Sequence, residues 1–388
     1  MPTSMNTEVS PALAERGTPS NTQALPAKRD HSLERGMPLP GARGPASCAL
    51  LEFLTGSGST SVDQVSRAVA VALRCTPDLV HDDDLQLALF CLYTLHYGGI
   101  AGVSDDWEWD LDLLAIRRRL EQAFEGALRG AVGAPDSDAV TDSLSSALFA
   151  MTGCGGEAEL AEYVGSQATD AQLHEFLVLR SVYTLMQADP HSWGIPRLQG
   201  AAKAALVEIQ SDEYGGGRPQ WMRSSAFARA LRHLGLDDEY GHYVDQVPGI
   251  VLASVNMMTL FGLHRRLRGS IVGHLAAFEL SAAAPSRLFG DGFRRNGYGT
   301  EVTGYFDESV EPDSIHARIA ARDLAESVVD AEPELLDDVL FGAAACLAME
   351  RWTAEAALTG WRTLGTALRG TPADVASPEA PRPAPVDA

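Results

Sequence analysis

The sequence predicts an all-α protein, and three observations carry this prediction. Apolar residues recur at helical spacing in segment after segment, and no convincing pair of alternating strands occurs. Helix stops also fall where helix chemistry expects them, at the glycine run 215–217 and at Pro285.

In the N-terminal third, helical spacing is clearest in residues 84–97 and 110–130, whose aromatic residues are typical of packing. We expect residues 46–155 to form a helical region. The sequence leaves open whether this region is an N-terminal subdomain or the outer layer of one larger bundle.

The rest of the chain, residues 156–368, is expected to form one helical bundle domain. Helical spacing occurs in residues 171–187, 200–215, 220–235, 270–284 and 337–361. Residues 247–263 are apolar almost throughout but are short and interrupted by Asn256, so we interpret them as a buried core helix rather than a membrane span.

Both ends of the chain differ from this pattern. Residues 1–45 and 369–388 are rich in Pro, Gly, Ala and polar groups and show no periodicity. We expect both segments to be disordered.

The overall charge excludes several classes of partner. The chain has 52 acidic and 30 basic residues, for a net charge of -22, so its surface repels phosphate backbones and anionic membranes. We therefore expect neither nucleic acid nor membrane as a partner. The five cysteines are scattered without a Cys-x-x-Cys pair, and no apolar stretch follows the N-terminus, which favours a cytoplasmic location.

In a helical bundle, a metal centre is built from carboxylates and histidines on inward faces, so we looked for charges on apolar helix faces. Glu279 is the only carboxylate in residues 270–284, which predicts a buried group that is paired, protonated or metal-bound. The alternative is a salt bridge at the helix end. Glu213 shares its helix with Glu208 and Asp212, and composition does not separate the three.

Asp313 and His316 are three residues apart, a spacing that suits two ligands of one ion. The alternative is a surface pair at a helix start, because Pro312 is a natural first-turn residue. Pro312 can also break the helix between Ser309 and Asp313. For the other histidines we expect hydrogen-bonded structural roles; these are His96, His191, His242, His264 and His274.

Several segments together resemble one family of proteins. They are "HYGGIAGVSDDWEWD", "ADPHSWGIPRLQGAAKAALVEIQSDEYGGGRP", "LDDEYGHYVD", "LFGLHRRLRGSIVGHLAAFE" and "DVLFGAAACLA". In this order, over residues 85–362, the chain is similar to the bacterial iron-containing redox enzymes, the heme-oxygenase-like diiron oxidases and oxygenases. The resemblance implies a heme-oxygenase-like helical bundle, here with an N-terminal helical extension. It also implies dioxygen chemistry on small molecules at two non-heme irons in the intact members, often in natural-product biosynthesis.

The resemblance also implies a ligand set. The family pattern asks for a Glu, a second Glu, a His ten residues later, a distant Glu, and a His-x-x-x-Asp-x-x-His helix. It is retained at four positions of this chain and changed at three. The retained positions are Glu213, Glu279, Asp313 and His316, and the changed ones are Gln187 for Glu, Arg223 for His and Ser309 for His.

The three changes predict a degraded metal site, because neither an amide nor a hydroxyl replaces carboxylate and imidazole ligands. We do not expect a complete diiron centre. The cofactor prediction is no metal, or a single Fe(II) held by Glu213, Asp313 and His316 with Gln187 as a weak fourth oxygen. Arg223 is expected to take the place of one iron and to neutralise part of the cluster formed by Glu213 and Glu279.

Three functional hypotheses follow. The first is a small-molecule tailoring enzyme with an anionic substrate, such as an amino acid or carboxylate, held by Arg223, and with Glu213, Glu279, Asp313 or His316 as general acid and base. The second is an oxygen-dependent non-heme iron oxygenase or oxidase with altered ligands. The third is a non-catalytic partner of an active homologue. A homodimer is expected from the bundle type.

Overall fold

The computed structural model describes residues 36–134, 137–140, 142–153, 156–308 and 315–370. These residues form helices joined by loops, and within them no strand occurs; one isolated bridge joins Met37 to Ile100. The prediction of an all-α protein is confirmed.

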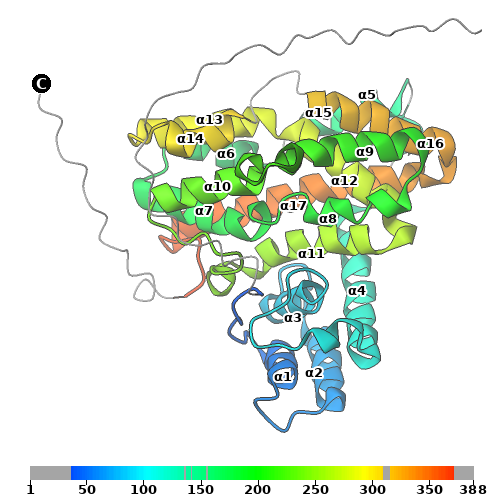
Figure 1. The fold of residues 1–388 in the computed structure, drawn as a ribbon, viewed down its shortest axis with the longest axis vertical. Coiled ribbons are helices and arrows are strands. Elements are labelled where there is room, and N and C mark those ends of the chain that lie inside the picture. Colours follow the sequence, from blue (N-terminus) through cyan, green and yellow to red (C-terminus); the bar gives the residue numbers. More distant parts are fainter. Residues whose placement is uncertain (1–35, 135–136, 141, 154–155, 309–314, 371–388) are drawn as a thin grey trace, which may run out of the picture.

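Four N-terminal helices form the lower part of the molecule in Figure 1. They are α1 (Pro45–Thr55), α2 (Val62–Cys75), α3 (Asp83–Thr94) and α4 (Leu111–Val132). Their apolar residues share one buried cluster with α11 (Gly249–Leu263) of the upper part. Inside this junction, the Asn256 amide on α11 donates to the backbone carbonyl and the side-chain oxygen of Gln86, at 2.9 and 2.8 Å.

The remaining helices lie above α11 in Figure 1, most of them running across the molecule. They are α5 (Leu144–Thr152), α6 (Ala158–Ser166), α7 (Asp170–Thr184), α8 (Asp189–Ser192), α9 (Gly200–Glu213), α10 (Arg223–His233), α12 (Arg268–Ser281), α13 (Ala283–Arg295), α14 (Thr300–Asp307), α15 (Ile315–Arg318), the π-helix η8 (Ile319–Glu326), α16 (Ser327–Ala331) and α17 (Leu336–Thr363).

Two glycines allow α12 and α17 to pack in very close contact. A Cβ atom added to Gly273 would lie 1.8 Å from the carbonyl oxygen of Val339, and one added to Gly342 would lie 2.0 Å from that of Ser270. Only glycine permits such an approach of two backbones. This contact fixes the polar residues at the end of α12 relative to those on α17.

Residues 247–263 were expected to form a buried core helix, and α11 is buried along nearly its whole length. Its interrupting residue, Asn256, is fully buried, and its amide nitrogen donates to Gln86. None of the described helices combines the length and apolarity needed to cross a bilayer.

The structure corrects one boundary and adds helices that were not predicted individually, among them α6, α13 and α14. Residues 36–44 were predicted to be disordered, yet Met37 is buried and its backbone bonds to Gly99 and Ala101 at 2.9 and 2.8 Å. Composition could not reveal these partners because they lie in a distant loop. Helices α13 and α14 were not predicted individually, since Pro285 suggested a stop; it lies in the first turn of α13, where proline is tolerated.

Candidate functional site

A cavity of about 490 Å³ lies inside the upper bundle. Helices α7, α9, α10, α12, α13, α14, α15 and α17 contribute side chains to its wall. Trp221 and Ile315 line it and are also exposed, so they mark a side of the cavity that reaches solvent. The predicted site residues that the structure describes, Gln187, Glu213, Arg223, Glu279 and His316, all line this one cavity.

Glu213 is the last residue of α9, and the glycine run that follows it places the next helix beside it. Gly215, Gly216 and Gly217 all have positive φ, which favours glycine, and a Cβ at Gly215 would lie 2.6 Å from the Trp221 backbone. The chain therefore ends α9 as predicted and then turns back, so that Arg223 begins α10 next to Glu213.

Gln187 is held in one orientation by two contacts. Its amide nitrogen donates to the Glu213 carboxylate at 2.8 Å, and its amide oxygen accepts from the Tyr305 hydroxyl at 3.3 Å. A glutamate here would place a second carboxylate against Glu213, whereas the amide donates a hydrogen bond to it. Burial raises the pKa of Glu213, against the opposing effects of Arg223, His316 and the bond from Gln187.

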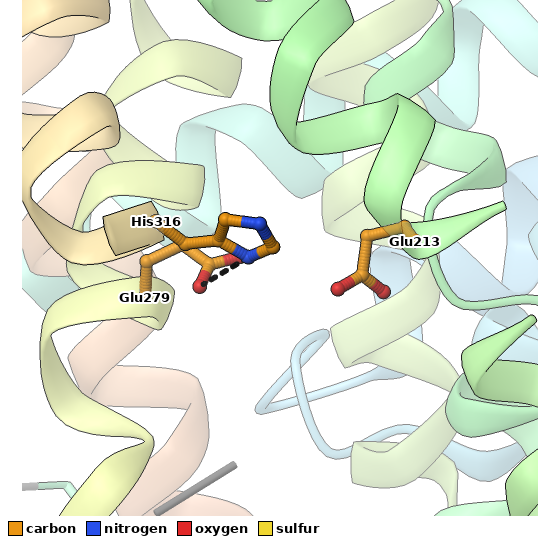
Figure 2. A group of neighbouring side chains, drawn as sticks. All are labelled: Glu213, Glu279 and His316. Atoms are coloured by element: carbon orange, nitrogen blue, oxygen red, sulfur yellow. Dashed lines mark ion pairs between the residues drawn. The ribbon is translucent and has the colours of Figure 1, made fainter. Parts of the chain in front are cut away.

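Glu279 and His316 meet across the cavity from Glu213 (Figure 2). The His316 Nδ1 lies 3.8 Å from the Glu279 carboxylate, and its Nε2 lies 2.9 Å from Asp212. Glu279 is near the end of α12 and its side chain keeps 12% exposure. It is therefore largely buried, as the apolar pattern predicted, and it also lies at a helix end beside a possible cation, His316, as the salt-bridge alternative required. Burial and the neighbouring Glu213 raise the pKa of Glu279 to about 7, although His316 and Arg223 act in the opposite direction.

Arg223 is the first residue of α10, where the helix dipole disfavours a cation. Its ion-pair partner among the described carboxylates is Glu308, at 3.7 Å, and its guanidinium lies 5.1 Å from the centre of the Tyr305 ring. We predicted that Arg223 neutralises part of the charge on Glu213 and Glu279, and its charge opposes the rise in the pKa of both carboxyls. Burial opposes the charge of Arg223 itself, yet Tyr305, Glu213, Glu308 and Glu279 raise its pKa.

Two predicted site residues, Ser309 and Asp313, lie outside the described residues. The predicted single-ion trio of Glu213, Asp313 and His316 is thus represented by two of its members. Glu279 joins them: Glu213, Glu279 and His316 each offer a ligand atom, and these atoms all lie within 4.8 Å of one another.

This donor set fits one divalent ion. Two carboxylates and one imidazole are ligands that Fe(II) and similar ions accept, and the bond between Asp212 and His316 Nε2 would orient the ring. Gln187 and Arg223, which line the same cavity, add neither a carboxylate nor an imidazole to this group. Among the described residues that line the cavity, no second cluster of metal ligands occurs.

A second polar cluster in the same cavity was missed by the sequence analysis. It consists of Glu157, Arg180, Ser281, Cys346 and Glu350. The signal was available, since Arg180 in "FLVLRSVY" and Glu350 in "CLAMERW" are isolated charges within apolar helical runs, which is the criterion that singled out Glu279.

His191 and His274 were expected to be structural, and the structure shows them bonded to each other. His191 Nε2 and His274 Nδ1 lie 3.1 Å apart, and both side chains are buried. Burial lowers the pKa of His191 to about 4, and burial together with His191 lowers that of His274. Both imidazoles are therefore neutral at physiological pH.

Comparison with known proteins gives two findings. The family described as iron-containing redox enzyme matches residues 174–351. The chain is also similar to an enzyme named nitrosourea synthase from Streptomyces achromogenes subsp. streptozoticus, with 28% identity over 225 residues. This match covers 56% of the present chain and 46% of that enzyme, so the chain spans less than half of the length of its relative.

The matched residues 174–351 run from α7 to α17 and contain every described member of the Glu213–Glu279–His316 group. The all-α architecture agrees with the heme-oxygenase-like bundle that the sequence segments imply. Residues 174–351 are therefore similar to the iron-containing redox enzyme family.

Proposed function

We propose that this protein is a small-molecule tailoring enzyme of natural-product biosynthesis, built on the heme-oxygenase-like scaffold, whose centre takes at most one metal ion. The single observation that carries the proposal is the bond from Gln187 to Glu213. It satisfies a buried carboxylate with an amide at a position where the family pattern has a metal-binding carboxylate. This half of the centre is therefore stable without an ion.

Arg223 also supports the proposal that the centre takes at most one metal ion. A permanent cation near Glu213 and Glu279 repels a divalent ion and compensates part of the carboxylate charge. Its guanidinium lines the cavity, where it suits an anionic group of the substrate, such as a carboxylate. The Tyr305 ring beside it restricts the positions that such a group can take.

The remaining trio would hold the one ion, if an ion is used. A single Fe(II) bound by Glu213, Glu279 and His316 would supply one-electron redox chemistry and reaction with dioxygen. Without it, these side chains provide general acid and base groups around the same space. Asp212 fixes the His316 ring in either case, because it accepts at Nε2 and leaves Nδ1 toward the cavity.

The metal content of the protein tests this proposal. The native chain and a variant carrying Gln187→Glu, Arg223→His and Ser309→His are loaded with Fe(II) without oxygen, and bound iron is measured after desalting. We expect at most one ion in the native chain and about two in the variant, because the variant restores the ligand types of the family pattern. Two irons in the native chain would overturn the proposal.

The role of Arg223 is tested separately by Arg223→Lys and Arg223→Gln. We expect turnover of the protein's own substrate to fall in both variants. The fall should be larger in Arg223→Gln, which has no charge at this position. Unchanged turnover in both would remove Arg223 from the proposed mechanism.

A second candidate function is an oxygen-dependent non-heme iron oxidase or oxygenase with a single iron. The mutual approach of Glu213, Glu279 and His316, together with the family match, favours it. It predicts that Fe(II)-loaded protein consumes dioxygen faster than free Fe(II), and that His316→Ala abolishes the difference. If the native chain takes up no iron, this candidate is eliminated and the metal-free enzyme stands.

A further inference from the structure

We infer that the cluster of Glu157, Arg180, Ser281, Cys346 and Glu350, hereafter the α17 cluster, is a subsite for an organic cation, an alkylammonium or guanidinium group of the substrate. This inference rests on the proposed function, because it assigns part of the same cavity to the substrate. It adds the chemical class of one end of that substrate.

The ion pairing inside the α17 cluster is incomplete. Arg180 Nη1 donates to both oxygens of Glu157, each at 3.1 Å, so these two charges neutralise each other. The Glu350 carboxylate accepts hydrogen bonds from the Ser281 hydroxyl at 3.2 Å and from the Cys346 thiol at 3.9 Å. Both donors are neutral. Among the described residues, no cationic side chain lies within ion-pair distance of Glu350.

The Glu350 carboxylate is thus the one charged group in the α17 cluster without a counter-charge. Burial and the negative charge of Glu157 raise the pKa of Glu350 to about 8, although Ser281, Arg180 and Cys346 oppose this. The partly buried Glu350 carboxyl, with no cation beside it, favours its protonated form, and a cation that arrives would favour the ionised form. An incoming ammonium or guanidinium would supply the missing charge, whereas an anion would add repulsion from Glu157.

The cluster is accessible to a ligand because it forms part of the cavity wall. The side chains of Arg180 and Glu157 keep 22% and 17% exposure. The described lining of the cavity as a whole includes six carboxylates and two arginines, so it attracts cations overall. Apolar side chains suited to a hydrocarbon stem also line it, namely Phe176, Leu179, Phe289 and Met349.

Tyr183 lines the same cavity as the α17 cluster and the Glu213–Glu279–His316 group. Burial raises the pKa of Tyr183, and Glu213, Tyr305, Glu279 and Cys346 add to this effect, so residues of both groups act on its hydroxyl. A substrate with its cation at Glu350 would extend through this cavity toward the residues proposed to react. Its anionic group, if present, would lie at the Arg223 end.

Equilibrium binding to the full chain, with no metal added, tests the inference. The probes are pentylamine, pentylguanidine, 1-pentanol and pentanoate, titrated by calorimetry. We expect the amine, the guanidine or both to bind roughly tenfold or more tightly than the alcohol and the carboxylate, and their ranking identifies the cation type. Equal binding of all four, or preference for pentanoate, would overturn the inference.

Three variants locate the bound cation. Glu350→Gln should lower cation affinity roughly tenfold or more, because it removes the charge and keeps the shape. The matched control Glu355→Gln changes an exposed residue of the same helix and should have no effect. Loss of affinity in Glu213→Gln with no loss in Glu350→Gln would place the cation at the other end of the cavity and contradict the assignment.

Proton release provides a readout that needs no variant. Titrations near pH 7 in buffers of different ionisation enthalpy should show release of close to one proton per bound cation, since Glu350 ionises on binding. Cation binding without proton release would contradict the role of Glu350 even if Glu350→Gln failed to fold. None of these measurements depends on iron content or turnover, so the inference and the proposed function can fail independently.

Discussion

At the scale of single residues, the centre is defined by how buried charges are compensated. Glu213 is compensated by the Gln187 amide and by Arg223 at longer range, while Glu279 faces His316. In the part of the chain that the structure describes, the donors that reach Glu350 are the neutral side chains of Ser281 and Cys346. Each of these differences can be tested by one isosteric substitution.

The first prediction concerns Gln187→Glu. We expect this variant, without metal, to lose about 1–3 kcal/mol of unfolding free energy, because a donor is replaced by a carboxylate against Glu213. Adding Fe(II) or Mn(II) should restore part of the loss. The measurement is denaturant unfolding with and without the ion, and the control is Gln122→Glu on the exposed face of α4. Equal stability of both variants without metal would contradict the account of the Gln187–Glu213 bond.

The second prediction concerns the pH dependence caused by Glu350. Its pKa is raised to about 8 in the folded protein, so the folded state binds more protons than the unfolded state between about pH 4.5 and 8. The contribution of Glu350 to stability is therefore full below about pH 4.5 and is lost as the pH rises through about 8.

In Glu350→Gln this dependence should disappear. The unfolding free energy of wild type should fall relative to that of the variant by a few kcal/mol, at most about 4, between pH 5 and 8.5. Denaturant unfolding of both proteins across this range measures the difference. A constant difference across the range would show that Glu350 ionises normally.

At the scale of elements, the cavity depends on close helix contacts and on one tight turn. The glycine contacts between α12 and α17 set the separation of Ser281 from Glu350, and the turn at Gly215 sets that of Arg223 from Glu213. The π-helix η8 follows directly after the short helix that carries His316, and π-helical turns are frequent at functional sites. The site is therefore positioned by backbone geometry as much as by side chains.

The third prediction concerns Gly342→Ala. We expect a loss of about 1–3 kcal/mol of unfolding free energy, since the new Cβ would lie 2.0 Å from the Ser270 carbonyl oxygen and α12 must move away. The control Gly126→Ala, in α4 with nothing within 4 Å, should be neutral or gain up to about 1 kcal/mol. Thermal unfolding of both variants gives the comparison, and a stable Gly342→Ala would show that α12 and α17 are not in rigid contact.

At the scale of the whole molecule, the N-terminal helices and the bundle share a hydrophobic core. The cluster that contains Leu50 and Phe124 also contains Met257 and Phe341, and the Asn256–Gln86 contact lies inside the junction. This arrangement favours the sequence alternative in which residues 46–155 are an outer layer of one bundle. The division into domains at residue 156 and the homodimer both stay predictions.

The fourth prediction follows from this shared core. Calorimetry of the full chain should give one unfolding transition, with the N-terminal helices and the bundle unfolding together. Tryptophan fluorescence, reporting on Trp107 among others, should follow the same curve as far-ultraviolet circular dichroism. Two resolved transitions would instead support an independent N-terminal subdomain.

The sequence by itself determined the helical class, the helices with strong apolar periodicity and the end of α9 at its glycine run. These features depend on local spacing and turn chemistry, which a sequence displays directly. Apolar patterning also pointed to Glu279, the spacing from Asp313 pointed to His316, and the family resemblance added Glu213. The structure brings these three together. Helix α13 was not predicted because Pro285, interpreted as a helix stop, lies in its first turn.

Only the tertiary structure decided which charges face one another. It paired Arg223 with Glu308 rather than with Glu213, placed Asp212 on His316, and gathered Glu157, Arg180 and Glu350 from three separate segments. Ion pairs and buried charges depend on distances between helices that are far apart in the chain, and no local pattern encodes those distances. The three changed ligand positions are visible in the residue types, whereas the α17 cluster is assembled only by the packing of α7, α12 and α17.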